Sequence, residues 1–159
     1  MSLAQNAVGA LSAAHEYFNR STRNLKEEHS TFAPSGELMT VAQQVAHTAQ
    51  TVDWFIQGAF RPEGFSMDFE NMAKQTMACT SLTAARAWFE KSIANAKAVL
   101  NAKNDAELLA PLPPGPIMGG HPRMTILSGI TDHTAHHRGV LTVYARLKGI
   151  VPPMPYMDM

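Results

Sequence analysis

The stretch "DHTAHHRGVLTVYARLKG" (residues 132–149) holds three histidines within five positions and continues as a helical pattern of apolar and basic residues. On a helix with about 100° per residue, His133 and His137 lie about 40° apart on one face, one turn above the other. Apolar side chains share that face, whereas His136 is displaced by roughly 80° from its centre. The pair is therefore predicted to point into the protein interior.

Three earlier segments also show helical periodicity, and no segment of useful length alternates as a strand would. The first helix is expected from about Leu3 to Glu28. The second follows a capping box formed by Thr40 and Gln43 and ends near Gly58. The third is expected from about Leu82 to Ala102, with Thr80 or Ser81 as its N-cap. The loop after the second helix is too irregular to assign, although it has room for a short helical turn.

The proline-rich stretch "PLPPGPIMGGHP" (residues 111–122) separates these helices from the last one. No helix continues through such a run of proline and glycine. The final helix is expected to begin at Pro122, to reach about Lys148 and to stop at Gly149. Four long amphipathic helices predict an all-α protein, a four-helix bundle that forms a single domain over residues 1–159, with sites built between facing helices.

Composition narrows the classes of function. Apolar residues make up 45% of the chain and charged residues 16%, which is typical of a globular protein and too interrupted for a membrane span. Thirteen basic residues balance thirteen acidic ones without a clustered basic stripe, so neither a nucleic acid nor a membrane is expected as a partner. The single cysteine, Cys79, and an N-terminus without signal-peptide character predict a cytoplasmic location.

Two imidazoles in a bundle interior need hydrogen-bond partners or a metal ion. Histidines at positions i and i+4 can both bind one divalent ion, but the same spacing also occurs in purely structural pairs. A third ligand from another helix would decide between these alternatives. His47 lies on a polar face of the second helix and His15 on an apolar stripe of the first, and periodicity does not choose between them. Weaker candidates are His29 and His121.

The sequence "VAQQVAHTAQ" (residues 41–50), followed by "TDHTAHHRGVLTVYARLKGI" (residues 131–150) and a proline-rich tail, resembles the DinB family of DinB/YfiT-like proteins along the whole chain. The resemblance implies an up-down-down-up four-helix bundle, commonly a homodimer, with a divalent metal held by three histidines. By their place in the motif, the metal ligands would be His47, His133 and His137. The chain departs from the family at Val140, where glutamine usually follows the HRG unit.

Three protein ligands leave a coordination position open for water or substrate. A metal there can activate a bound thiol or a bound water. The resemblance implies a metal-dependent transferase that uses a low-molecular-weight thiol, or a hydrolase, acting on a small molecule. Zinc or nickel is favoured, with iron and manganese as alternatives. No catalytic residue is assigned: Tyr144 is interpreted as a buried hydroxyl bonded to a carbonyl, and Arg138 as an outward-facing residue of an ion pair, dimer contact or anion site.

Two other hypotheses remain open at the level of sequence. The protein could be a dimeric binding or sensing module in which the metal has a stabilising role and no turnover occurs. It could also be a metal-free bundle with structural histidines, in which case substitutions of His47 and His133 would show no energetic coupling.

Overall fold

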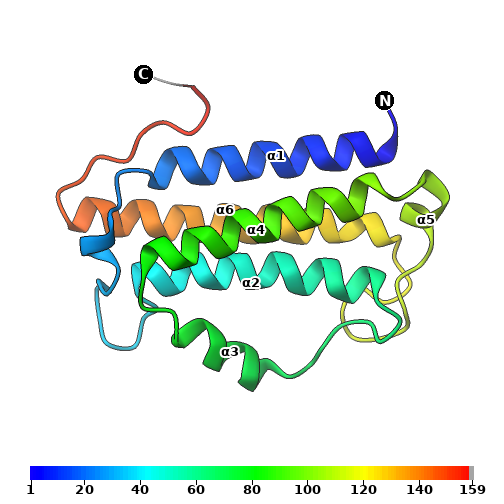
Figure 1. Ribbon diagram of the computed structural model, residues 1–159, viewed down its shortest axis with the longest axis horizontal. Coiled ribbons are helices and arrows are strands. Elements are labelled where there is room, and N and C mark those ends of the chain that lie inside the picture. Colours follow the sequence, from blue (N-terminus) through cyan, green and yellow to red (C-terminus); the bar gives the residue numbers. More distant parts are fainter. Residues whose placement is uncertain (158–159) are drawn as a thin grey trace.

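Four long helices lie side by side in the computed structural model, which describes residues 1–157 (Figure 1). Residues 158 and 159, the end of the predicted domain, lie outside the described part. Helices α1 and α2 each pack against both α4 and α6. Within residues 1–157 the named elements are all helical, which confirms the predicted all-α class. The four long helices are α1 (Leu3–Thr22), α2 (Val41–Phe60), α4 (Leu82–Asn101) and α6 (Ile126–Leu147).

Shorter elements connect the long helices: η1 (Glu27–His29), α3 (Phe69–Met77), α5 (Asp105–Leu109) and η2 (Arg123–Thr125). The colour ramp of Figure 1 shows that α2 returns antiparallel to α1. The segment containing α3 then carries the chain back along α2, so that α4 begins at the same end as α2 and runs parallel to it. Helix α6 runs antiparallel to α2, and this pairing brings the C-terminal histidine stretch against the second helix.

Local sequence signals set several helix ends. The Thr40 hydroxyl accepts the N–H of Gln43, and the Gln43 side chain accepts the N–H of Thr40, which confirms the predicted capping box. Ser81 caps α4 through the N–H of Ala84. Gly149 follows α6 with a φ of 73°, a left-handed conformation that glycine adopts without the steric penalty of a Cβ.

The first helix was predicted too long, because it ends at Thr22 and not near Glu28. After Thr22 the chain leaves the α-helical path, and Glu27 and Ser30 cap the N-terminus of α4. The Glu27 carboxylate accepts both the N–H and the hydroxyl of Thr83 at 2.7 Å, and the Ser30 hydroxyl accepts the N–H of Leu82 at 2.9 Å. These bonds satisfy first-turn N–H groups of α4. The periodicity of the first helix gives no sign of this role, because the capped residues lie far along the chain.

The predicted start of the last helix at Pro122 was also wrong, because α6 begins at Ile126 after the 3-10 turn η2. The Arg123 N–H donates to the Ala110 carbonyl at 2.9 Å, and Pro111 pairs with Pro122 across an isolated bridge. These backbone contacts connect the two ends of the proline-rich loop and keep residues 122 and 123 out of the α-helix.

The loop after α2 contains a true helix, α3, where only a short turn had been anticipated. Gln43 and Gln50 attach α3 to α2: their amide nitrogens donate to the carbonyls of Met77 at 2.9 Å and Met72 at 2.8 Å. The Thr76 hydroxyl completes the contact by donating to the Gln50 side-chain oxygen at 2.9 Å. Side chains of α2 thus hold a helix of which, apart from Thr76, no residue is fully buried.

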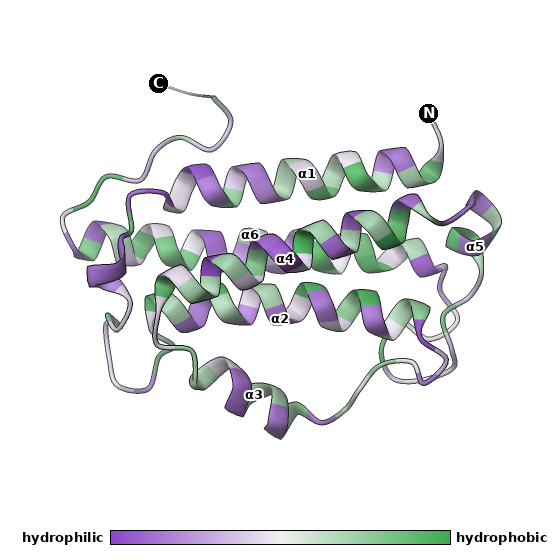
Figure 2. Ribbon diagram, viewed as in Figure 1, coloured by the Kyte–Doolittle hydropathy of each residue, from purple (hydrophilic) through white to green (hydrophobic). Residues whose placement is uncertain are grey.

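Apolar side chains fill the space between the four long helices, and Figure 2 shows hydrophobic and hydrophilic residues alternating along each of them. Among the described residues, no helix is both long and apolar enough to cross a bilayer. The largest fully buried side chains include Leu11, Phe18, Phe89, Leu100, Ile130 and Leu141.

Candidate metal centre

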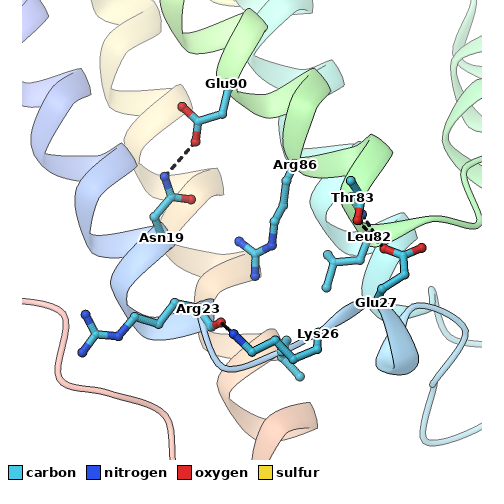
Figure 3. Close-up of a pocket in the computed structure, with 9 residues that line it drawn as sticks. Asn19, Arg23, Lys26, Glu27, Leu82, Thr83, Arg86 and Glu90 are labelled. Atoms are coloured by element: carbon cyan, nitrogen blue, oxygen red, sulfur yellow. Dashed lines mark hydrogen bonds between the residues drawn. The ribbon is translucent and has the colours of Figure 1, made fainter.

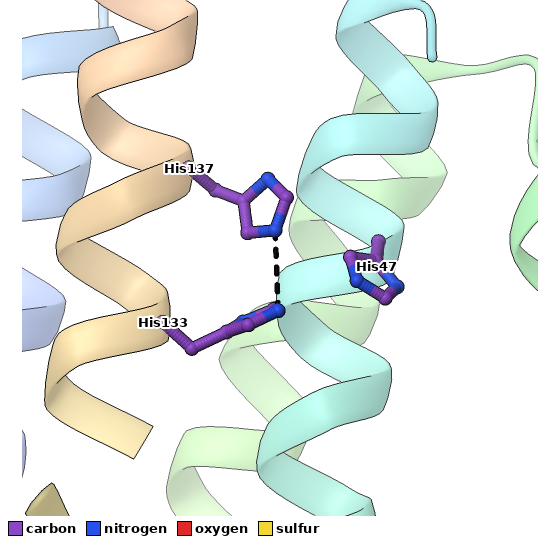
Figure 4. A group of neighbouring side chains, drawn as sticks. All are labelled: His47, His133 and His137. Atoms are coloured by element: carbon purple, nitrogen blue, oxygen red, sulfur yellow. Dashed lines mark hydrogen bonds between the residues drawn. The ribbon is translucent and has the colours of Figure 1, made fainter. Parts of the chain in front are cut away.

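The side chains of His47, His133 and His137 meet between α2 and α6 (Figure 4). Each offers one ring nitrogen, and these nitrogens all lie within 4.8 Å of one another. The Nε2 atoms of His133 and His137 are 3.2 Å apart. The His47 ring lies edge-on to both, with centroid distances of 4.9 Å and 5.0 Å. The structure therefore brings together the three residues that the resemblance singled out.

The spacing of the two ring nitrogens from α6 suits one divalent ion. Two nitrogens each about 2.0–2.1 Å from a tetrahedral ion are about 3.3 Å apart, close to the 3.2 Å that separates His133 from His137. The Nδ1 atom of His133 is buried and has no hydrogen-bond partner within residues 1–157. A buried nitrogen without a partner is uncommon and costly, but an ion bound at Nε2 would leave Nδ1 equally without one, so this atom does not distinguish a metal-binding role from a structural one.

The position of His47 on α2 determines which elements lie on either side of the cluster. Gln43 and Gln50, on one side of His47 in the helical projection, bind α3. Gln44 and Thr51, on the other side, contact the histidines of α6. His47 thus lies on the strip of α2 between α3 and α6. Because His47 and His133 keep partial exposure, the cluster can be reached from solvent along this strip.

Burial keeps the three imidazoles neutral near pH 7. Desolvation lowers the pKa of His133 to about 4 and that of His137 to about 3, with further lowering by the neighbouring histidines. Desolvation is also the main cause of the lowered pKa of His47, followed by His136. A neutral imidazole has a lone pair available, which is the form that binds a metal ion.

Two side chains of α2 hold the histidines of α6 in place. The Gln44 side-chain oxygen lies 2.5 Å from Nδ1 of His137, and the Thr51 hydroxyl lies 3.5 Å from Nε2 of His133. Helical periodicity by itself places Gln44 and Thr51 on the same face of α2 as His47. Their contacts with α6 could not be read from it, because they depend on the register between two helices that are distant in the chain.

The other histidines lie outside the cluster. His15 is bonded to Glu90 at 2.8 Å, so the first helix does not supply the third nitrogen. His29 accepts a backbone N–H through its Nδ1 at the end of η1. His121 is exposed in the proline-rich loop, and His136 is exposed with its ring edge-on to His137. Among the described residues, the grouping of metal-ligating side chains comprises only His47, His133 and His137.

Tyr144 and Arg138, the other two residues singled out from the sequence in the C-terminal stretch, make structural contacts. The hydroxyl of Tyr144 donates to the Met39 carbonyl at 3.0 Å, as interpreted from the sequence. Arg138 lies on the outer side of α6, over the rings of Tyr17 and Tyr156 at 5.9 Å and 6.0 Å from their centroids. Its guanidinium group therefore helps to hold the C-terminal tail against α1 through cation–π contacts.

A pocket lined largely by charged and polar residues lies between the end of α1 and the start of α4 (Figure 3). Asn19 donates to the Glu90 carboxylate at 2.9 Å, and Arg86 donates to the Thr22 carbonyl at 2.7 Å. The Glu27 carboxylate is engaged by Thr83, as described above. These polar and charged groups join α1 and the segment after it to the first half of α4, and none of the three clustered histidines lines the pocket.

Comparisons with known proteins agree with the fold and the motif. The family model described as "DinB family" matches residues 6–159. A solved structure, described as the conserved protein of locus from Enterococcus faecalis, is similar with a TM-score of 0.66 and 20% sequence identity. The similarity covers 92% of this chain and 97% of that one, and at this identity it shows the fold alone. Among curated proteins, none matches the sequence.

Proposed function

The chain belongs to the DinB family, and from this premise we propose that it binds one divalent metal ion through His47, His133 and His137. The observation that carries the proposal is the convergence of three ring nitrogens, from two facing helices, to within 4.8 Å of one another. Zinc or nickel is the favoured ion, because three neutral imidazoles suit either. We also infer that the four long helices are the family's up-down-down-up bundle, which the helix directions in Figure 1 support.

We propose further that the centre is catalytic and activates a small thiol, with water as the alternative nucleophile. Three protein ligands leave a position open, and a metal bound there supplies Lewis acidity that lowers the pKa of a thiol or water. The thiol would lose its proton and form a C–S bond to an electrophilic carbon of a small substrate, and a leaving group would depart with the electron pair of the broken bond; this reaction would make the protein a metal-dependent S-transferase. Activated water would make it a hydrolase.

The surroundings of the cluster favour a thiol over water. Among the described residues, no Asp or Glu joins the three-histidine group. The hydroxyl of Tyr144 already donates to the Met39 carbonyl, so it is not available as an acid. With no carboxylate in the group and the Tyr144 hydroxyl engaged, a nucleophile that ionises easily is favoured, and a thiol with a pKa of about 8.5 needs far less assistance than water.

The contacts around the cluster assign roles to the chain's own residues. Gln44 holds His137 through Nδ1, which directs its Nε2 toward the other two histidines. His47 and His133, the partly exposed members, would border the position that the substrate approaches. A homodimer and a cytoplasmic location remain proposals, which rest on the family resemblance and on the single cysteine respectively.

The alternative function is a non-catalytic, dimeric binding or sensing module that the metal stabilises. It shares the three-histidine centre with the enzyme and differs in chemistry. The module would retain its metal tightly, lose much of its stability on chelation, and show no turnover with thiols or hydrolysable esters.

The first experiment measures the metal content of untagged protein by elemental mass spectrometry. We expect nearly one divalent ion per chain in the wild type, and its loss in His47→Ala, His133→Ala and His137→Ala. His136→Ala is the matched control, because His136 is exposed on the same helix and lies outside the cluster. A wild-type protein that contains no metal, even after reconstitution, would overturn the proposal.

A second experiment separates the two nucleophiles. Protein loaded with Co²⁺ is titrated with a small thiol, and the thiolate-to-metal absorption band is followed. Saturable growth of this band in the wild type, absent without Co²⁺, supports a thiol substrate. A spectrum that does not respond to thiols, together with ester hydrolysis that requires the metal, would assign the centre to water activation. A loaded centre that neither responds to thiols nor shows turnover would support the binding module.

A further inference from the structure

A line of three buried side chains runs from the backbone before α2 to the candidate metal centre. The members are Tyr144, Gln44 and His137, which are 4%, 6% and 7% exposed. Each polar group in such surroundings must be satisfied by a neighbour, since water does not reach it readily. The direction of each hydrogen bond in the line is therefore constrained by the next.

The direction is set at the end that lies farthest from the histidines. The Met39 carbonyl can only accept, so the hydroxyl of Tyr144 uses its one proton to donate there, at 3.0 Å. The Tyr144 oxygen then has only lone pairs to offer to Gln44. The Gln44 amide nitrogen, 3.5 Å away, must therefore be the group that faces Tyr144, and the amide oxygen must face the other way.

The Gln44 oxygen lies 2.5 Å from Nδ1 of His137. Because this oxygen is an acceptor, Nδ1 of His137 must carry a proton. A neutral imidazole has one N–H only, so the Nε2 atom of His137 is left with a free lone pair. That atom is the one that faces Nε2 of His133 at 3.2 Å.

We propose that Gln44 and Tyr144 are positioning residues that select the tautomer of His137, so that its Nε2 is free to bind the metal. The Met39 carbonyl fixes the direction of the Tyr144 hydroxyl, which orients the Gln44 amide, and the amide oxygen then accepts from Nδ1 of the His137 ring. The inference rests on the proposed metal centre for its purpose, but the tautomer itself is a property of the metal-free protein and can be measured there.

The main test is the nitrogen NMR spectrum of the histidine rings in metal-free protein near pH 7. In the wild type, His137 is expected as the single tautomer protonated at Nδ1. In Tyr144→Phe the ring that packs against Phe32 is retained but the hydroxyl is lost, so the Gln44 amide can turn over and both tautomers are expected. Tyr17→Phe is the matched control, because Tyr17 lies on α1 against Tyr156.

The second readout is metal affinity. Gln44→Leu removes the acceptor for His137, and a loss of roughly 10–100-fold is expected, the range found for other outer ligand-orienting groups. In Tyr144→Phe the lost hydroxyl is one hydrogen bond further from His137, so the metal affinity of this variant should lie between those of the wild type and Gln44→Leu. Gln44→Glu retains an oxygen that accepts from Nδ1, so this conservative variant should keep wild-type affinity or exceed it.

The outcomes separate the two proposals. A His137 tautomer that is the same in the wild type, Tyr144→Phe and Gln44→Leu overturns the inference, whatever the metal affinity. The inference is equally overturned if the wild-type ring is protonated at Nε2. If the tautomer responds as expected but the wild type binds no metal, the hydrogen-bond line stands and the proposed metal centre fails.

Discussion

Gly129 of α6 lies against the tip of the ring of Phe55 of α2. A Cβ atom built on Gly129 would stand 2.5 Å from Cζ of Phe55, closer than packed carbon atoms approach each other. Phe55 is buried in the core shared by the long helices. The absence of a side chain at Gly129 therefore allows α2 and α6 to pack at the separation that brings His47 to His133 and His137.

Gly129→Ala should destabilise the protein by about 1–3 kcal/mol, because the ring of Phe55 must move in a packed core. Gly139→Ala is the matched control on the same helix. A Cβ on Gly139 would meet nothing within 4 Å, so alanine should stabilise α6 by roughly 0.5–1 kcal/mol through its higher helix propensity. Chemical denaturation of both variants tests the pair, and equal effects of the same sign would contradict this packing.

Metal addition should stabilise the wild type against thermal unfolding. At a free metal concentration about 100 times the Kd, linkage predicts about 2.7 kcal/mol of added stability. His133→Ala removes one of three ligands, so its unfolding temperature should respond little to the same metal concentration and equally little to subsequent chelation. An equal response in the wild type and in His133→Ala would show that the stabilising metal binds elsewhere.

The contact between Glu27 and the start of α4 should make stability depend on pH. Hydrogen bonds from the Thr83 side chain and backbone lower the pKa of Glu27 from 4.5 to about 2. Because the folded-state pKa is the lower one, the stabilisation is complete above about pH 4.5 and is lost as the pH falls from about 4.5 to about 2. The stability difference between the wild type and Glu27→Gln should therefore shrink across this window.

Denaturation of both proteins at pH 7, 5, 4 and 3 measures that difference. Thr83→Val supplies a second comparison, since it removes the hydroxyl donor and keeps the backbone donor. Its dependence on pH should lie between those of the wild type and Glu27→Gln. A difference that stays constant from pH 7 to pH 3 would show that the charge on Glu27 does not contribute.

Ser92 should be a position where a smaller, apolar residue increases stability. Its side chain is 1% exposed, and within residues 1–157 its hydroxyl has no hydrogen-bond partner. Ser92→Ala removes this unsatisfied group and introduces the strongest helix former in the middle of α4, so we expect a gain of about 1 kcal/mol. A loss of stability measured by chemical denaturation would indicate that the hydroxyl is satisfied in solution.

The sequence alone determined those features that depend on neighbours along the chain. Thr40 with Gln43, Ser81 and Gly149 mark helix ends because capping groups act within a few residues. His133 and His137 were predicted to share a face because helical geometry sets that relationship by itself. The order and spacing of the histidine motifs along the chain resembled those of a known family, and this resemblance singled out His47. It also predicted that the chain belongs to the DinB family, which the family model confirms.

Only the tertiary structure decided the contacts between segments distant in the chain. Periodicity left His15 and His47 open as the third histidine, and packing excluded His15 by pairing it with Glu90 of α4. The early end of α1 follows from the bond between Glu27 and Thr83, and the contact of Gln44 with His137 follows from the register of α2 against α6. Such contacts depend on how side chains far apart in sequence fit together in the folded protein, and helical periodicity carries no information about that fit.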